Sequence, residues 1–471
     1  MTTPDPSTSP ARLTRATGLG RPAAPVRILH VGVGNFFRAH QAWYTDRSPD
    51  AAQWGIAAFT GRSAAMADAL NPQDGLYTLI TRAADGDSFD VISSISAVHA
   101  AADHEAWVRY WSDPELAVVT LTVTEAGYLR AVDGSLDTAN PGVQADIAAL
   151  AADPTAAATT APGRIVSGYL ARRAAGAGAI AIVPCDNLPD NGPALRRVVD
   201  ELIAAIDPTL ADWAAENVAF GTTMVDRITP ATTDEHRDAV RAALGVEDTS
   251  PVPTEPFSEW VIAGDFPKGR PDWAAAGATI VDDVVPFEQR KLWLLNGSHS
   301  LLAYAGSIRG HETVADAIND PVSRAWVEQW WDEAAAHLSL PQAEITEYRH
   351  ALLERFENPR IRHVLAQIAA DGSQKIPVRI VPALRAELAA GRTPAGATRV
   401  IAAWVAHLRG HGAPVKDSRA AEVAPFGEGT VEESVDKVLS FLGADLAANE
   451  DVHAAVAAHV AELVGQEAAP R

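Results

Sequence analysis

The sequence predicts an α/β protein with two domains, a doubly wound N-terminal domain followed by a mostly α-helical C-terminal domain. Three observations support this prediction. The 471 residues exceed the size at which a single hydrophobic core usually stops growing. In the first part of the chain, apolar strand-like runs alternate with alanine-rich amphipathic stretches. After Asp282, helical periodicity dominates the sequence.

The N-terminal domain is expected over residues 26–283, after a flexible leader over residues 1–25. The leader is rich in Pro, Thr and Ser and lacks the apolar region of a signal peptide. The domain opens with an apolar strand pattern at Val26 to Val31, which runs through two glycines into helix-compatible sequence. Further strand-like runs are Trp54 to Thr60, Leu116 to Thr124, Ala179 to Pro184 and Val218 to Met224, with helical stretches at Gln144 to Ala152 and Pro193 to Ala205. Such alternation predicts βαβ units and a mostly parallel sheet.

The C-terminal domain is expected over residues 284–471. The change in periodicity places the boundary near Val281 to Pro286, and a proline-rich loop at Ser250 to Pro256 is a competing hinge. Helical periodicity is clearest in Arg324 to His337, Ala397 to His411 and Val431 to Leu446.

Composition excludes several classes of protein. A hydrophobic fraction of 47% is ordinary for a globular chain, and no apolar run approaches the ~20 residues that span a bilayer. The net charge of −22 argues against a nucleic-acid partner, because phosphate binding needs clustered Lys and Arg. The single cysteine, Cys185, allows neither an intramolecular disulfide nor a cysteine-rich zinc site. We therefore expect a cytoplasmic protein without a metal, with a small molecule as its partner.

Gly32 and Gly34 follow the first predicted strand and precede a predicted helix. In that context, glycines let a pyrophosphate approach backbone N–H groups, as in Rossmann-like domains. The third glycine of the usual fingerprint is replaced by Phe37, so the glycines alone do not distinguish a dinucleotide site from a structural turn.

The second predicted strand ends at Thr60-Gly61-Arg62-Ser63, without the acidic residue that often binds the adenosine ribose. Arg62 and Ser63 could hold a 2′-phosphate, which would favour NADP, or Arg62 could simply be solvated. NAD is the expected cofactor, and NADP stays open.

The segment from Glu288 to His299 places polar residues in an otherwise apolar helix. At about 100° per residue, Lys291, Asn296 and His299 fall within an arc of roughly 140°, which also contains Glu288. Gly297 could bend the helix. The spacing predicts that these polar side chains can meet in one pocket.

Lysine is scarce in this chain, and Lys291 directly precedes an apolar run, Leu292 to Leu295. Burial disfavours an ammonium group, so Lys291 is a candidate general base that accepts a hydroxyl proton as hydride leaves the carbon. The amide of Asn296 can donate to the developing alkoxide, and His299 can orient the same hydroxyl. The alternative is a surface lysine beside a capping asparagine and a buried core histidine.

The sequence resembles the polyol-specific long-chain dehydrogenases, the mannitol dehydrogenase family, from Ile28 to about Leu442. The motifs that carry this resemblance are GVGNFFRAHQAWYTD, VTEAGY, PCDNLPDNG, MVDRITP, EPFSEWVI, KLWLLNGSH and DGSQKIP. The resemblance implies a nicotinamide-dependent, metal-independent secondary-alcohol dehydrogenase that interconverts a polyol and its ketose. Members of the family are commonly monomers, so we expect a monomer.

The resemblance also implies roles for individual residues. Lys291 would be the general base, Asn187 and Asn296 the alkoxide-stabilising pair, and His299 a substrate-orienting group. Glu288 would lie on a proton path between the lysine and solvent. Substrate hydroxyls would be contacted by Asp226 and Lys375. Residues at the cofactor site would be Gly32, Gly34, Asn35, Phe36, Thr124 and Glu125, with Arg62 as a further candidate.

Other functions stay open. The chain lacks the Tyr-xxx-Lys arrangement of short-chain dehydrogenases and the cysteines of zinc-dependent alcohol dehydrogenases. Gln367 stands where the mannitol enzymes would have an arginine, so a fructuronate or mannonate reductase, or an arabinitol or sorbitol dehydrogenase, is an alternative. A sugar carboxylate would need an arginine, and Arg360, Arg362 and Arg379 are candidates. A function of a different class is a nucleotide-binding sensor without turnover.

Overall fold

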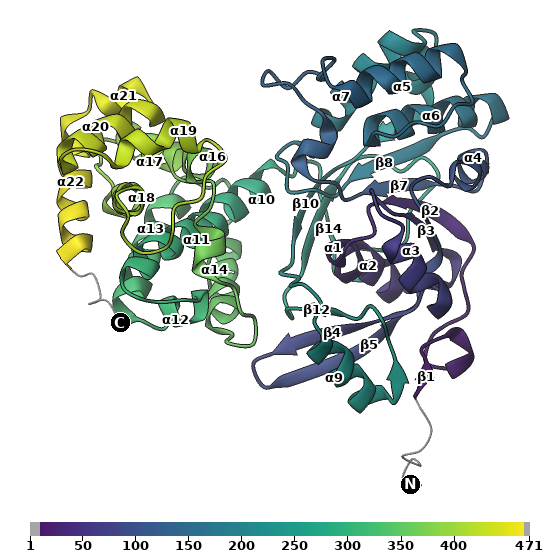
Figure 1. The fold of residues 1–471 in the computed structure, drawn as a ribbon, viewed down its shortest axis with the longest axis horizontal. Helices are drawn as coiled ribbons and strands as arrows, with labels where there is room; N and C mark the ends of the chain where they lie inside the picture. Colours follow the sequence, from purple (N-terminus) through teal and green to yellow (C-terminus); the bar gives the residue numbers. More distant parts are fainter. Residues whose placement is uncertain (1–9, 466–471) are drawn as a thin grey trace. The chain divides into compact units, whose positions relative to one another are not determined.

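The computed structural model describes residues 10–465, and the chain divides into two compact units, Met1–Val284 and Val285–Arg471 (Figure 1). The division lies within the Val281 to Pro286 segment and not in the Ser250 to Pro256 loop. Within residues 10–465, no helix combines the length and the apolar character that crossing a bilayer requires.

A six-stranded parallel sheet forms the centre of the first unit, with the strand order β6-β3-β2-β7-β8-β9. The strands are β2 (Val26–Val31), β3 (Gly55–Phe59), β6 (Ile95–His99), β7 (Val118–Leu121), β8 (Ile180–Pro184) and β9 (Val218–Phe220). The order reverses between β2 and β7, which is where open α/β sheets bind ligands at their carboxyl edge.

Helices cover both faces of this sheet, as a doubly wound fold requires (Figure 1). Side chains alternate along β2, so that Leu29 packs with one set of helices and Ile28 with the other. The first face is covered by α4 (His104–Trp111), α5 (Pro141–Ala152), α6 (Ala161–Ala175), α7 (Asn191–Ile206) and α8 (Leu210–Asn217). The second is covered by α1 (Asn35–Ala39), α2 (Gln41–Arg47) and α3 (Ala65–Leu70). The predicted Rossmann-like organisation is confirmed.

Smaller sheets complete the first unit. The hairpin of β4 (Tyr77–Ala83) and β5 (Gly86–Ile92) pairs with β12 (Val252–Thr254), next to α9 (Asp234–Leu244). β10 (Thr222–Asp226) pairs with β13 (Glu259–Ala263), which pairs with β14 (Thr279–Ile280). The sequence patterns did not reveal β6 or these smaller sheets.

Two predicted strands need correction. The run Val218 to Met224 is two strands separated by Gly221, because β9 belongs to the parallel sheet and β10 pairs with β13 instead. A Cβ atom on Gly264 would lie 2.8 Å from the Gly221 Cα, so the close approach of these two segments requires glycine. The run Leu116 to Thr124 is a strand only over Val118–Leu121, because Val123 donates its N–H to a side chain outside the sheet.

The predicted flexible leader also differs from the structure. Residues 1–9 lie outside the described residues, whereas the segment from residue 10 to 25 packs against the first unit. β1 (Ala11–Arg12) pairs with β11 (Val246–Glu247), and Leu13 is fully buried. The Arg15 guanidinium donates to the carbonyl oxygens of Ser93 and Ile95. These contacts fix residues of a segment that the composition predicted to be a flexible leader.

The second unit is mostly helical, as predicted. Its longer helices are α13 (Pro321–Ala335), α14 (Gln342–Glu357), α17 (Val381–Ala389), α18 (Ala395–Leu408), α20 (Val431–Leu442) and α22 (Glu450–Gly465). The predicted helix Val431 to Leu446 ends early, because Gly443 has a φ of 155° that interrupts the helix before α21 (Ala444–Ala447).

Candidate functional site

The turn after β2 is held in one conformation by its neighbours. Gly32 has a φ of 105°, and a Cβ atom there would lie 2.1 Å from the Thr122 carbonyl oxygen. The buried His30 ring contacts the Gly32 carbonyl oxygen through Nε2 at 2.9 Å and the Thr120 hydroxyl through Nδ1 at 2.8 Å. Burial lowers the pKa of His30 to about 3, so the imidazole is neutral. The structure thus requires Gly32 for the fold itself.

Gly34 is different, because a Cβ atom added there would meet no atom within 4 Å. Its φ of −93° is also open to any residue. The fold therefore does not explain this glycine. A ligand that approaches the backbone closely would explain it, and this fits the pyrophosphate of a dinucleotide.

The other predicted cofactor residues of this turn have contacts within the protein. The Asn35 amide nitrogen donates to the Pro230 carbonyl oxygen at 3.0 Å, and its oxygen accepts from Arg38. The Phe36 ring stacks on His40 with a centroid distance of 4.9 Å. Phe37, which replaces the third glycine, is buried against His30 with a centroid distance of 3.5 Å. The large ring thus fills space in the core where the usual fingerprint has glycine.

The remaining candidates of the first unit follow the ends of strands. Thr124 and Glu125 lie at the start of a short 3₁₀ helix (Glu125–Tyr128) after β7, and both are exposed. Asn187 is exposed in the loop after β8, and Arg62 is exposed in the loop after β3. Asp226 is the last residue of β10 and is 5% exposed.

In the second unit, the helix that carries Lys291 is not a regular α-helix. α10 (Val285–Arg290) leads into a π-helical segment, Lys291–Asn296, then α11 (Gly297–Leu301) and a second π-helical segment, Leu302–Gly306. A π-helical turn closes between residues i and i+5, so Lys291 and Asn296 lie one turn apart. The arc of roughly 140° expected for a regular α-helix therefore does not apply to Lys291 and Asn296. The wider π-helical turn brings the two residues closer to the same side of the helix. π-Helical turns are frequent at functional sites.

The neighbouring helix α13 supports the π-helical segment. The indole nitrogen of Trp330 donates to the Trp293 carbonyl oxygen at 2.9 Å, and that of Trp331 donates to the Leu294 carbonyl oxygen at 3.0 Å. Gly297 does not bend the helix; it permits this packing, because a Cβ atom there would lie 2.7 Å from Trp330 Nε1. These indoles satisfy carbonyl groups that an α-helix would use internally.

His299 follows Asn296 by three residues, so the two share a face of α11. His299 is 7% exposed, and its Nε2 atom has no hydrogen-bond partner among the described residues. Its ring contacts Phe356 and the edge of His363, at centroid distances of 5.0 and 4.8 Å. Burial, followed by the charge of His363, holds the pKa of His299 well below its usual value. A buried, unpartnered nitrogen of this kind fits a hydrogen bond to a bound ligand.

Two basic residues of α16 (Gly372–Arg379), Lys375 and Arg379, have different hydrogen-bond partners. The Lys375 ammonium donates to the carbonyl oxygens of Ile368 and Ala370, at 3.0 and 2.5 Å. Lys375 was expected to contact substrate, and these bonds involve two of the three N–H groups of its ammonium. The Arg379 guanidinium instead donates to the Asn296 carbonyl oxygen and the Ser300 hydroxyl, both at 3.2 Å. Arg379 therefore lies beside the predicted catalytic segment.

Of the other two candidate arginines, Arg362 is exposed. Glu288 precedes Lys291 by three residues and is half-buried in α10. His30, Asp186 and His363 were not predicted as site residues. Asp186 lies in the motif PCDNLPDNG, but its side-chain contacts, like those that His30 makes with Thr120 and His363 with His299, join residues distant in the sequence.

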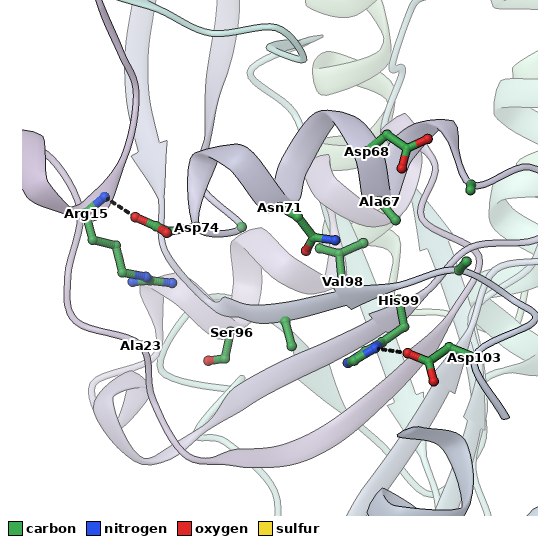
Figure 2. A pocket seen from close by; sticks show the side chains of 14 residues that line it. Arg15, Ala23, Ala67, Asp68, Asn71, Asp74, Ser96, Val98, His99 and Asp103 are labelled. Carbon is green, nitrogen blue, oxygen red and sulfur yellow. Dashed lines mark hydrogen bonds and ion pairs between the residues drawn. The ribbon is translucent and has the colours of Figure 1, made fainter. Parts of the chain in front are cut away.

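A groove of about 730 Å³ runs along the edge strand β6, beneath α3 (Figure 2). At one end His99 Nδ1 lies 2.7 Å from the Asp103 carboxylate, and at the other the backbone N–H of Arg15 donates to Asp74. None of the predicted site residues lines this groove. Within residues 10–465, no group of three His, Cys, Asp or Glu side chains gathers as metal ligands would.

The strand order and the glycine turn define a Rossmann-type domain in the first unit. Residues 26–275 match the mannitol dehydrogenase Rossmann domain, and residues 283–464 match the mannitol dehydrogenase C-terminal domain. The chain belongs to the mannitol dehydrogenase family of oxidoreductases, as its motifs predicted.

The names of individual relatives indicate different substrates. D-mannonate oxidoreductase of Escherichia coli K12 is 38% identical over 458 residues, which cover 93% of each chain. Mannitol 2-dehydrogenase of Cereibacter sphaeroides is 37% identical, with 83% of this chain and 82% of the relative covered. The structure of Pseudomonas fluorescens mannitol 2-dehydrogenase with NAD and D-mannitol has a TM-score of 0.78 and 34% identity, covering 93% of this chain and 92% of that one. A substrate-free D-sorbitol dehydrogenase has a TM-score of 0.85 and 29% identity, covering 96% and 100%.

Proposed function

We propose that this protein is a polyol dehydrogenase that interconverts a polyol and its ketose by hydride transfer with a nicotinamide cofactor. The observation that carries this proposal is the π-helical turn that aligns Lys291 with Asn296 and continues into His299. Family membership and the substrates named for its relatives support it. In this role Lys291 is the general base, and Glu288, one helical turn earlier, is the group that exchanges its proton with solvent.

The remaining roles follow from the chemistry of each side chain. When an alcohol is oxidised, negative charge develops on its oxygen, and the amides of Asn187 and Asn296 can donate to that oxygen. The unpartnered Nε2 of His299 orients the same hydroxyl group. Asp226 and Lys375 stay the proposed contacts to the other hydroxyls. The enzyme is proposed to work as a cytoplasmic monomer without a metal.

NAD is the proposed cofactor, and it would accept the hydride in alcohol oxidation and donate it in the reverse reaction. Gly32 and Gly34, with Asn35 and Phe36, would hold it beside Thr124 and Glu125. The open space at Gly34 is the feature of the structure that fits a dinucleotide. Arg62 is exposed in the loop after β3, so NADP stays an alternative that a direct comparison of the two cofactors decides.

Gly34→Val should abolish binding of the reduced cofactor while the protein stays folded. The valine meets no protein atom within 4 Å at its Cβ position, but it occupies the space that the pyrophosphate needs. Cofactor fluorescence measures binding, and circular dichroism measures folding. Gly86→Ala in the β4–β5 hairpin is the matched control, because that glycine is equally open. Unchanged affinity in folded Gly34→Val would contradict this cofactor site.

A second candidate, a sugar-acid dehydrogenase, is favoured by the charges around His299. Besides His363, the charges of Arg355, Arg379 and Lys375 all act to lower the pKa of His299, after burial as the main cause. A substrate carboxylate would be attracted to such a region, and a guanidinium can bind it with two hydrogen bonds. The relationship to D-mannonate oxidoreductase agrees with this candidate.

Prolonged treatment with EDTA should leave the activity unchanged, because the proposed mechanism uses a lysine base and no Lewis acid. The measurement compares initial rates before and after removal of the chelator. A loss of activity that added zinc restores would show that the proposed reaction class is wrong.

A further inference from the structure

We propose that Asp186 is a positioning residue, which ties the cofactor-facing loop after β7 to the loop after β8 that carries Asn187. The proposal rests on the proposed function, since it takes Thr124, Glu125 and Asn187 as parts of the site. Asp186 lies outside the residues that would touch substrate or cofactor, and it would act only through the two loops.

Both oxygens of the Asp186 carboxylate bind the loop after β7. Oδ1 accepts from the Val123 backbone N–H at 2.5 Å, and Oδ2 accepts from the Tyr128 hydroxyl at 2.6 Å. Val123 and Tyr128 lie on either side of Thr124 and Glu125, so the carboxylate holds both ends of the segment that carries these residues. Asp186 is 7% exposed and Tyr128 is fully buried, so water competes little for these bonds.

The backbone of Asp186 is fixed from a third direction. The buried Asn191 side chain donates to the Asp186 carbonyl oxygen at 3.1 Å and to the Thr223 carbonyl oxygen at 2.8 Å, and it accepts from the Thr223 N–H at 3.0 Å. Thr223 belongs to β10, the strand that ends in Asp226. A continuous set of buried hydrogen bonds thus connects the loops that carry Thr124 and Asn187 with the strand that ends in Asp226.

The protonation state of Asp186 should affect this connection. Burial raises the pKa of Asp186 to about 7, although the bonds from Tyr128 and Val123 lower it. The titratable side chains that face it are Tyr128 and Cys185, and burial, followed by the Asp186 charge, raises the pKa of each. Both therefore stay protonated at neutral pH, and Asp186 is the member of this group that titrates. The ionised form accepts two charge-assisted bonds, whereas the protonated form loses or reverses one.

The test measures binding of NADH to Asp186→Ala and Asp186→Asn. Asp186→Ala should weaken NADH binding by about 10- to 100-fold, the effect of losing hydrogen bonds to a charged group. Asp186→Asn should recover part of this loss, because its amide can accept from Val123 and donate to Tyr128. Wild-type affinity should rise as the pH rises through about 7, and this rise should be absent in Asp186→Asn. Hydrogen exchange over Val123 to Tyr128 should be faster in Asp186→Ala.

Asp146→Asn is the matched control. Asp146 is also a buried carboxylate of the first unit, and it accepts from the backbone and hydroxyl groups of Thr159 and Thr160. Asp146→Asn should lower stability without changing the pH dependence of NADH binding. Wild-type affinity and pH dependence in Asp186→Ala would overturn the proposal.

The hydrogen-exchange measurement separates this proposal from the proposed function. If wild-type protein does not bind NADH, the proposed function fails, and the exchange rates still report whether Asp186 ties the loop. If wild-type protein binds NADH and Asp186→Ala leaves exchange unchanged over Val123 to Tyr128, the positioning role alone is wrong.

Discussion

Lys291→Ala should lower the rate of alcohol oxidation by about 10²–10⁴-fold, the range typical for loss of a general base. The affinity for the cofactor should stay close to that of the wild type, because the proposed cofactor residues belong to the other unit. In the wild type, oxidation should rise with pH through one ionisation, since only the free amine accepts a proton. Steady-state kinetics over a pH series and cofactor titrations measure these effects.

Lys416→Ala is the control for this variant, because Lys416 is an exposed lysine of the same unit. It should keep wild-type kinetics. A small primary amine added to Lys291→Ala should restore part of the rate by replacing the missing base. If Lys291→Ala keeps near-normal turnover, or loses activity only by failing to fold, Lys291 is structural and His299 becomes the candidate base.

Arg172→Leu should destabilise the first unit by at least ~3 kcal/mol, because buried carbonyl groups that lose their donor each cost about 1–3 kcal/mol. The Arg172 side chain is fully buried in α6. Its guanidinium donates to the carbonyl oxygens of Trp111, Asp113, Leu116, Ala177, Gly178 and Ala179. These carbonyls belong to the segments that lead into β7 and β8. Thermal and chemical unfolding measure the loss, which should lower Tm by roughly 2–4 °C per kcal/mol.

Arg173→Leu, the change at the next residue, is the matched control. Arg173 forms an ion pair of 2.6 Å with Asp207, in which the side chains are 31% and 28% exposed. Such a partly exposed pair contributes about 0–1 kcal/mol, so Arg173→Leu should be only slightly destabilised. Equal stability losses in the two variants would show that the carbonyl contacts of Arg172 do not stabilise the fold as described.

Much of the fold could be predicted from periodicity. The strand at Val26 to Val31 has the predicted bounds, and the fold class is confirmed. The predicted strand bounds were wrong where contacts between residues distant in the sequence determine the structure. Val123 donates its N–H to Asp186 and not to the sheet, and β10 leaves the parallel sheet just after Gly221, which lies close to Gly264. Neither contact leaves a local pattern in the sequence.

In the candidate site, too, local sequence patterns predicted some features, whereas contacts between residues distant in the sequence determined others. The motif around Lys291 was visible in the sequence, but its π-helical turn was not, and this turn accepts hydrogen bonds from Trp330 and Trp331 of another helix. The sequence also could not distinguish the two glycines of the turn after β2. The structure shows that Gly32 is needed for the fold, whereas Gly34 faces open space.

The most direct test of the proposed function is turnover by the wild-type protein with a panel of polyols and sugar acids. The panel should include mannitol, arabinitol, sorbitol and mannonate, each with NAD and with NADP, and the reduced cofactor is followed by its absorbance. We expect oxidation of at least one polyol coupled to reduction of NAD, at a rate about 10²–10⁴-fold lower in Lys291→Ala under the same conditions. Turnover of mannonate alone would favour the sugar-acid candidate. Cofactor binding without turnover of any member of the panel would contradict the proposed enzyme and favour a nucleotide-binding sensor.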